Sequence, residues 1–138
     1  NIIGDSTPVI VYEIQTYKET STDPIIIHLI ETLAKRDIDI RNTTIMFYNW
    51  TAMSHIPWHN DGHAKAALTI YLNEEWDPNW GGAFLYKDSE SDDIKAIYPQ
   101  ARRGVLQTGG VMHHVCPTSR SAPIRNTIQI FFGIEKYE

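Results

Sequence analysis

The sequence predicts a mainly β fold, either a β-sandwich or a double-sheet jelly roll, supported by one N-terminal helix. Two observations predict it. Short runs rich in β-branched and aromatic residues recur along the chain, and residues that favour turns separate them. Only one segment places apolar residues at helical spacing. Many short strands with little helix are typical of these two-sheet folds.

The predicted helix covers residues 24–35. It follows Asp23, a residue type that caps helix N-termini, and begins with Pro24, which is favoured at the first helical position. Apolar residues then recur at the spacing of one helix face, which predicts that this face is buried. These residues are Ile26, Leu29, Ile30 and Leu33.

The predicted strands are separated by turns, including a polar turn at residues 15–22. The strands are 8–14, 43–50, 55–61, 66–73, 82–87, 94–98, 103–108, 111–116 and 124–132.

Two of these strands alternate clearly between faces. In the first, Leu68, Ile70 and Leu72 would pack under the helix, while Thr69, Tyr71 and Asn73 would face a wet, functional interior. In the second, one face carries Asn126, Ile128, Ile130 and Phe132, and the other carries Arg125, Thr127, Gln129 and Phe131.

The size and composition indicate one domain spanning residues 1–138. The net charge of −5 and the lack of a basic stripe argue against nucleic acid as a partner. No apolar run approaches the roughly 18 residues of a membrane span, and no signal peptide is visible. The single cysteine, Cys116, excludes an intrachain disulfide and favours a cytoplasmic location. The chain begins at Asn1 rather than Met, which is compatible with further residues upstream; the oligomeric state is not indicated.

His59 and Asp61 are the first candidate metal ligands. Residues at i and i+2 of a strand point to the same face, so both side chains can reach one ion. A histidine from another strand, His113 or His114, would complete a set of two histidines and one carboxylate, which is the facial triad that holds Fe(II) and leaves open positions. The same residues are also compatible with a hydrogen-bonded polar pair at a strand end, or with a zinc hydrolase.

Arg125 and Tyr71 form a candidate site for a carboxylate. An arginine binds a carboxylate through two hydrogen bonds, and a tyrosine hydroxyl adds a further donor. Taken singly, Tyr71 is better explained as a core aromatic residue, and Arg125 is equally well explained as an exposed charge on a strand.

Three stretches of the chain together resemble the Fe(II)- and 2-oxoglutarate-dependent oxygenases, in particular the prolyl-hydroxylase-like group. The resemblance covers residues 43–132. The stretches are His59-x-Asp61; Leu68 to Asn73 followed by Trp76 and Gly81-Gly82; and His113-x-Val115-x-Pro117 followed by Arg125-x-x-Ile128.

The resemblance implies a double-stranded β-helix with His59, Asp61 and His113 as iron ligands. It selects His113 over His114, which periodicity alone does not, because both faces of that strand are mostly apolar. It further implies that Arg125 binds 2-oxoglutarate, assisted by Tyr71, with Tyr48 near the position of another tyrosine that contacts this cosubstrate.

The implied function is hydroxylation of an unactivated C–H bond, foremost in a peptidyl proline, with release of succinate and CO₂. Fe(II), 2-oxoglutarate and O₂ are the expected cofactors, with ascorbate as a further candidate. The partner would be a peptide, protein or small-molecule substrate. Two alternatives remain open: hydroxylation of a free amino acid or other small molecule, and a cupin-like module that binds metal without turnover.

Other residues are weaker candidates. His63 would share the face of His59 and Asp61 if the strand continued past Gly62, a residue that weakens strands. His55 would also share this face in a regular strand, but Pro57 lies between it and His59. Trp50, Trp58 and Trp80 are candidates for the mouth of the barrel, and Arg102 and Arg103 for contact with an acidic substrate.

Overall fold

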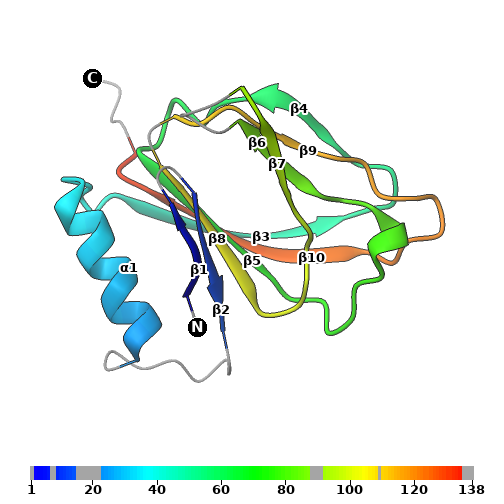
Figure 1. Ribbon diagram of the computed structural model, residues 1–138, viewed down its shortest axis with the longest axis horizontal. Coiled ribbons are helices and arrows are strands. Elements are labelled where there is room, and N and C mark those ends of the chain that lie inside the picture. The colour runs from blue at the N-terminus through cyan, green and yellow to red at the C-terminus, as the bar shows by residue number, and fades with distance from the viewer. Residues whose placement is uncertain (1, 7–8, 15–22, 88–91, 109, 135–138) are drawn as a thin grey trace.

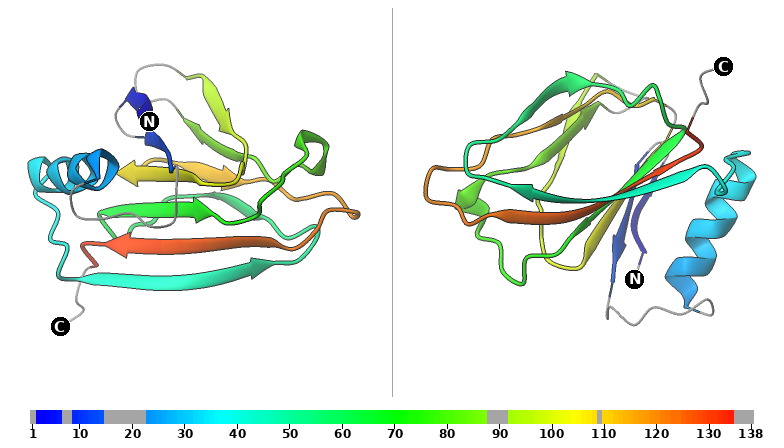
Figure 2. Two further views of the ribbon diagram at one scale, coloured as in Figure 1. Left: turned by 90° about the horizontal axis from the view of Figure 1, so that it is seen from below. Right: turned by 180° about the vertical axis from the view of Figure 1, so that it is seen from behind.

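Two antiparallel sheets face each other in the computed structural model, which describes residues 2–6, 9–14, 23–87, 92–108 and 110–134 (Figures 1 and 2). The larger sheet has the strand order β1-β2-β8-β5-β10-β3, and the smaller one β4-β9-β6-β7. The strands are β1 Ile2–Ser6, β2 Val9–Glu13, β3 Thr43–Trp50, β4 Ile56–His59, β5 Ala66–Tyr71, β6 Phe84–Lys87, β7 Ile94–Ile97, β8 Arg103–Thr108, β9 His113–Val115 and β10 Arg125–Phe132. This confirms the predicted jelly roll with one N-terminal helix.

The helix α1, Pro24–Lys35, begins where the sequence predicts. The Asp23 side chain accepts a hydrogen bond from the backbone N–H of Ile25 at 2.8 Å, which satisfies one of the free donors of the first turn. The predicted buried stripe was partly wrong: Ile25 and Leu33 are buried, whereas Ile30 is 47% exposed. Apolar residues occupy so much of the helix surface that their spacing alone does not fix which side faces the sheet.

The helix lies beside the larger sheet, on the side away from the smaller sheet (Figure 1). Residues of α1 and of the outer sheet face form one hydrophobic cluster, which includes Leu33, Ile10, Leu68 and Leu106. The helix does not cover the whole outer face. Phe47, on the edge strand β3, lies on this face and is 74% exposed. The outer face is therefore an apolar, structural surface.

A second hydrophobic cluster occupies part of the space between the two sheets. Tyr71 from the larger sheet meets Phe84, Tyr86 and Ile97 from the smaller one. Tyr71 thus lies on the inner face while Leu68 lies on the outer face, as the alternation predicted. On β10, the buried side chains of Arg125 and Thr127 likewise belong to the inner face, where they line the space between the sheets.

Several element boundaries differ from prediction. Strand β4 ends at His59 rather than at residue 61, and its pairing with β9 is irregular after Ile56, because Pro57 lacks the backbone N–H that a regular ladder needs. Asp61 instead opens a turn, in which its carbonyl accepts from the N–H of Ala64 at 3.0 Å. Asn73 lies past the end of β5. Its side chain donates to the carbonyl of Ile124, just before β10, and accepts from the N–H of Asn126 within β10.

Two elements were not predicted. Strand β1 contains Gly and Asp, which are depleted in strands, so its sequence carries little β signal. Pro78–Trp80, expected within a turn, forms a short 3₁₀ helix capped by Asp77. The turn predicted at residues 15–22 lies outside the described residues. None of the helices in the described residues combines the length and the apolar character that a membrane span needs.

Candidate active site

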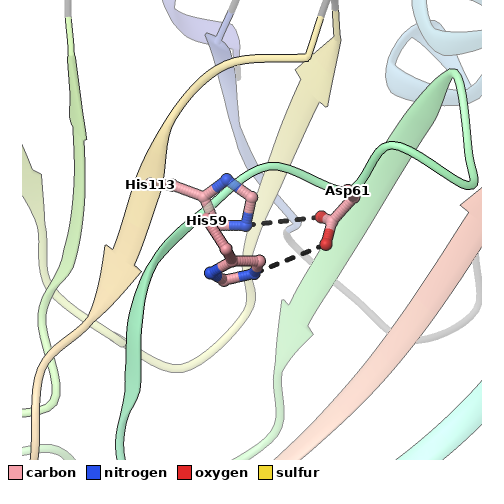
Figure 3. Close-up of side chains that lie close together, drawn as sticks. All are labelled: His59, Asp61 and His113. Carbon is pink, nitrogen blue, oxygen red and sulfur yellow. Dashed lines mark ion pairs between the residues drawn. The ribbon is translucent and has the colours of Figure 1, made fainter.

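Three side chains converge between the sheets. His59 is the last residue of β4 and His113 the first of β9, and these two residues are cross-strand partners. Asp61 follows β4 by two residues and turns its carboxylate toward both rings (Figure 3). Its Oδ1 lies 3.4 Å from Nε2 of His59, and its Oδ2 lies 3.3 Å from Nε2 of His113. The three donor atoms lie within 4.8 Å of one another, close enough to share one ion.

Backbone carbonyls orient both imidazoles. Nδ1 of His59 lies 2.8 Å from the carbonyl of Pro57, and Nδ1 of His113 lies 2.9 Å from the carbonyl of Val111. Because a carbonyl only accepts, each Nδ1 carries the proton. In the neutral form of each ring, the lone pair of Nε2 therefore faces Asp61. Two lone pairs and a carboxylate facing one another repel unless a cation lies between them, so the donor set fits a metal ion.

Asp61 supplies the negative charge. Burial raises the pKa of its carboxyl. The hydrogen bond and positive charge of His113, with the positive charges of His59 and His63, lower it more when these rings are protonated. The net pKa lies below its usual value, so the group is ionised at neutral pH. A carboxylate with two imidazoles is the ligand set predicted from the sequence, and the structure brings all three groups together.

The two adjacent histidines face opposite ways. His113 is 3% exposed, and its ring stacks on Phe84 at a centroid distance of 5.3 Å. His114 points to the other side of the smaller sheet, where its ring lies 5.6 Å from that of Trp58. The structure thus places His113 on the inner face, which is the register that the family resemblance implied.

A cavity of about 390 Å³ adjoins the three residues. Its lining comes from the inner faces of both sheets, and the residues expected to bind a carboxylate lie on the larger sheet. These residues are Arg125, Tyr71 and Tyr48.

Arg125 is a buried cation, only 2% exposed. Its Nη1 donates to the carbonyl of Gly82 at 2.9 Å, and its guanidinium packs over the ring of Trp50 at 4.8 Å. No carboxylate pairs with it in the part of the chain that the structure describes, and its Nε is buried without a hydrogen-bond partner there. A buried guanidinium with unused donors is expected to bind an anion that enters the cavity.

Gly82 makes room for this arginine. Its φ of +75° is a conformation that L side chains rarely adopt, and a Cβ there would approach Nη1 of Arg125 to 3.1 Å. A larger residue would therefore strain the backbone at this position and require the guanidinium to shift by a few tenths of an ångström.

The two tyrosines lie in the same cavity but differ in environment. Tyr71 is 3% exposed, and burial raises the pKa of its hydroxyl although the charges of Arg125 and Arg103 oppose this. The hydroxyl therefore stays protonated and can donate. Tyr48 is half-buried, and its hydroxyl contacts the sulfur of Met46 at 3.4 Å.

Other candidates from the sequence fall outside the cluster of three. His63 is exposed and lies over Phe131 at a ring distance of 4.9 Å, because the strand ends before it. His55 is exposed in the loop before β4. His63 is near enough to influence Asp61 electrostatically but is not one of the converging ligands.

The tryptophans and the arginine pair are dispersed. Trp50 lines the cavity, whereas Trp58 lies on the outer side of the smaller sheet, 5.9 Å from Nζ of Lys87. Trp80 packs edge-on against Trp76. Arg103 donates to Gln100 and to the carbonyl of Tyr98 and does not line the cavity, and the neighbouring Arg102 is exposed. Of these candidates, the structure brings only Trp50 to the site.

Residues 43–133 match the 2OG-Fe(II) oxygenase superfamily. The chain belongs to that superfamily. It is therefore a 2-oxoglutarate-dependent dioxygenase, an enzyme class that uses Fe(II), 2-oxoglutarate and O₂. No curated protein matches the sequence significantly.

Solved structures share the fold. A prolyl-4-hydroxylase from Pseudomonas putida is 18% identical, with a TM-score of 0.64, and the match covers 98% of this chain and 78% of that one. A Trichoplax adhaerens prolyl hydroxylase in complex with a hypoxia-inducible-factor peptide is 16% identical, with a TM-score of 0.62 and coverage of 91% and 63%. HygX from Streptomyces hygroscopicus, solved with iron bound, is 10% identical, with a TM-score of 0.59 and coverage of 96% and 85%.

Proposed function

We propose that residues 1–138 form a single catalytic domain that hydroxylates a peptidyl proline, with 2-oxoglutarate as cosubstrate and succinate and CO₂ as products. One observation carries this proposal. Two histidines and a carboxylate that could hold a metal ion line the same cavity as a buried arginine, which pairs with no carboxylate among the described residues. A zinc hydrolase would leave Arg125 without a role.

His59, Asp61 and His113 are the proposed iron ligands. All three project from one side, because two come from the end of β4 and its following turn and the third from the adjacent strand β9. A one-sided ligand set leaves coordination positions open toward the cavity. The bound iron supplies the oxidative chemistry, and the chain supplies ligand orientation and a largely apolar pocket.

Arg125 is the proposed partner of the distal carboxylate of 2-oxoglutarate. Trp50 and Gly82 hold its guanidinium in place before the cosubstrate arrives, which reduces the entropy lost on binding. Tyr71 adds a protonated hydroxyl donor next to this charge. Tyr48 lies in the same cavity, and we propose for it an auxiliary contact with the cosubstrate.

The choice of a peptide substrate is supported by the relatives of similar fold. Two of them are prolyl hydroxylases, and one of these was solved with a bound peptide. A cavity of about 390 Å³ is within the ordinary range for a small-molecule site, and it adjoins the two edge strands β3 and β4, past which an extended peptide can run.

Turnover with defined substrates tests the proposal. The purified protein is mixed anaerobically with Fe(II) and 2-oxoglutarate, and a visible charge-transfer band reports chelation. Air is then admitted with a peptide library in which each proline-containing peptide has a matched alanine version. We expect succinate formation and the gain of one oxygen atom in proline peptides only.

Two results would contradict specific parts of the proposal. Hydroxylation of free amino acids but of no peptide would reassign the substrate and leave the cofactors in place. Absence of both the charge-transfer band and succinate would overturn the assignment of the site itself.

A further inference from the structure

Gln107 has no role in the proposed function, yet it occupies an unusual position. It lies on the inner face of β8, paired with Val9 of β2 and Ala67 of β5, in the middle of the larger sheet. It is 7% exposed. Such positions are normally apolar, because burying an amide requires that its hydrogen bonds be replaced.

The amide makes one short contact, and that contact is with Asp61. Nε2 of Gln107 donates to Oδ2 of Asp61 at 2.6 Å and lies 3.4 Å from Nε2 of His113. The orientation of the amide follows from chemistry. With its nitrogen and oxygen exchanged, two acceptors would face each other at 2.6 Å. A short hydrogen bond to an ionised carboxylate is among the stronger kinds.

The other end of the amide is unsatisfied. Oε1 of Gln107 is buried, and no donor reaches it within the described residues. Buried polar atoms are nearly always hydrogen-bonded, so the unpaired Oε1 is a cost in stability that the other hydrogen bonds of this side chain must offset. The other polar atom of Gln107 is the nitrogen that binds Asp61.

We propose that Gln107 is a positioning residue that makes Asp61 a ligand through one oxygen. Its N–H engages Oδ2, which leaves Oδ1, the oxygen nearer His59, to bind the metal. A carboxylate that binds through both oxygens would occupy a second coordination position. Holding Asp61 to one oxygen keeps that position free for the cosubstrate. This inference rests on the proposed function, because it needs a metal ion at the three ligands.

Gln107→Leu tests the inference, with Gln100→Leu as the matched control. Leucine keeps a side chain of similar size and removes the donor. Gln100 is also hydrogen-bonded, to Arg103 at 2.7 Å, but it is exposed in the turn before β8. We expect the affinity of Gln107→Leu for Fe(II), measured anaerobically by calorimetry, to fall about 10- to 100-fold, the usual effect of removing a partner of a metal ligand. Gln100→Leu should bind as the wild type does.

Spectroscopy separates positioning from a merely structural role. With Co(II) as the probe, the visible absorption of Gln107→Leu should change in shape, because the coordination of Asp61 changes. The Fe(II) charge-transfer band should require more 2-oxoglutarate for the same reason. The thermal unfolding of the metal-free protein should be unchanged or higher, since the unpaired Oε1 is removed as well. If Gln107→Leu does not fold, Gln107→Asn, whose shorter amide does not reach Asp61, must show the same losses.

The outcomes distinguish this inference from the proposed function. If the wild type binds Fe(II) and Gln107→Leu binds it equally well with the same Co(II) spectrum, Gln107 does not position Asp61, and the proposed function stands. If the wild type binds no Fe(II), both fail. If Gln100→Leu is weakened to the same degree, the effect is not specific to the contact with Asp61, and the inference is wrong.

Discussion

The two faces of the larger sheet differ in chemistry although the same strands build them. On β8, Leu106 faces outward beneath α1 and is fully buried in the outer cluster, while Gln107, the next residue, faces inward and binds Asp61. On β5, Leu68 faces outward and Tyr71 inward. The outer face stabilises the sheet through apolar burial, and the inner face presents polar groups at a cost in stability. Substitutions on the two faces should therefore separate stability from activity.

The largest effect is expected at Asp61. Asp61→Ala removes a ligand outright, so we predict that Fe(II) affinity falls by more than the roughly 100-fold that loss of an outer partner causes, and that turnover is abolished. The metal-free protein should remain folded, because Asp61 lies in a turn and belongs to neither hydrophobic cluster. Calorimetry with Fe(II) and circular dichroism measure the two properties. Asp92→Ala, an exposed position, is the control; normal turnover by Asp61→Ala would exclude this residue as a ligand.

Arg125→Ala should act on the cosubstrate alone. Loss of a buried, hydrogen-bonded charge costs about 2–5 kcal/mol of binding, which corresponds to a rise of roughly 30- to 4,000-fold in the 2-oxoglutarate requirement. Fe(II) affinity should stay nearly constant. Steady-state succinate assays across a range of 2-oxoglutarate concentrations measure this, beside Arg120→Ala, which changes an exposed arginine. An unchanged KM for 2-oxoglutarate would show that Arg125 has another role.

Leu106→Ala tests the outer face. Truncating a fully buried leucine typically destabilises a protein by about 2–5 kcal/mol, through lost transfer free energy and the cavity that remains. The free energy of unfolding, from urea titration, should fall by this amount. Fe(II) affinity of the folded fraction should not change. A large loss of metal affinity in folded Leu106→Ala would mean that the two faces are not separable.

The smallest effect is expected at the helix N-terminus. Asp23→Ala removes the cap of α1 and should cost about 1 kcal/mol of unfolding free energy. The 2-oxoglutarate requirement and the Fe(II) affinity should both match the wild type. A change in either would show that α1 affects the site as well as the outer face.

The sequence predicted helix starts and the inner and outer faces of strands well where the capping or alternation pattern was strong. Asp23-Pro24 located the start of α1, and strict alternation on β10 assigned Arg125 to the inner face. The sequence did not predict which side of α1 faces the sheet, because apolar residues cover most of that helix. Strand β4 proved shorter than predicted, because pairing depends on backbone donors that Pro57 lacks.

The candidate ligands could be found from the sequence, but the residues that support them could not. His59 and Asp61 are close in sequence, and the family pattern chose His113 over His114. Gln107 lies in an otherwise ordinary strand and meets Asp61 only through folding across a separation of 46 residues. The stacking of Trp50 on Arg125 similarly depends on the register of β3 against β10, which pairs these two residues directly.

The most direct test of the site is the pair of adjacent histidines, because the register of β9 decides which one reaches the metal. Anaerobic titration of purified His113→Ala and His114→Ala with Fe(II) compares the metal affinity of two variants that differ only in which of the adjacent histidines is removed. We predict that His113→Ala loses Fe(II) binding and all 2-oxoglutarate turnover, because its ring faces Asp61. His114→Ala should keep the metal and at least part of the activity, because its ring packs on Trp58 outside the cavity. An iron-loaded His113→Ala beside a metal-free His114→Ala would contradict the assignment and place the strand one residue out of register.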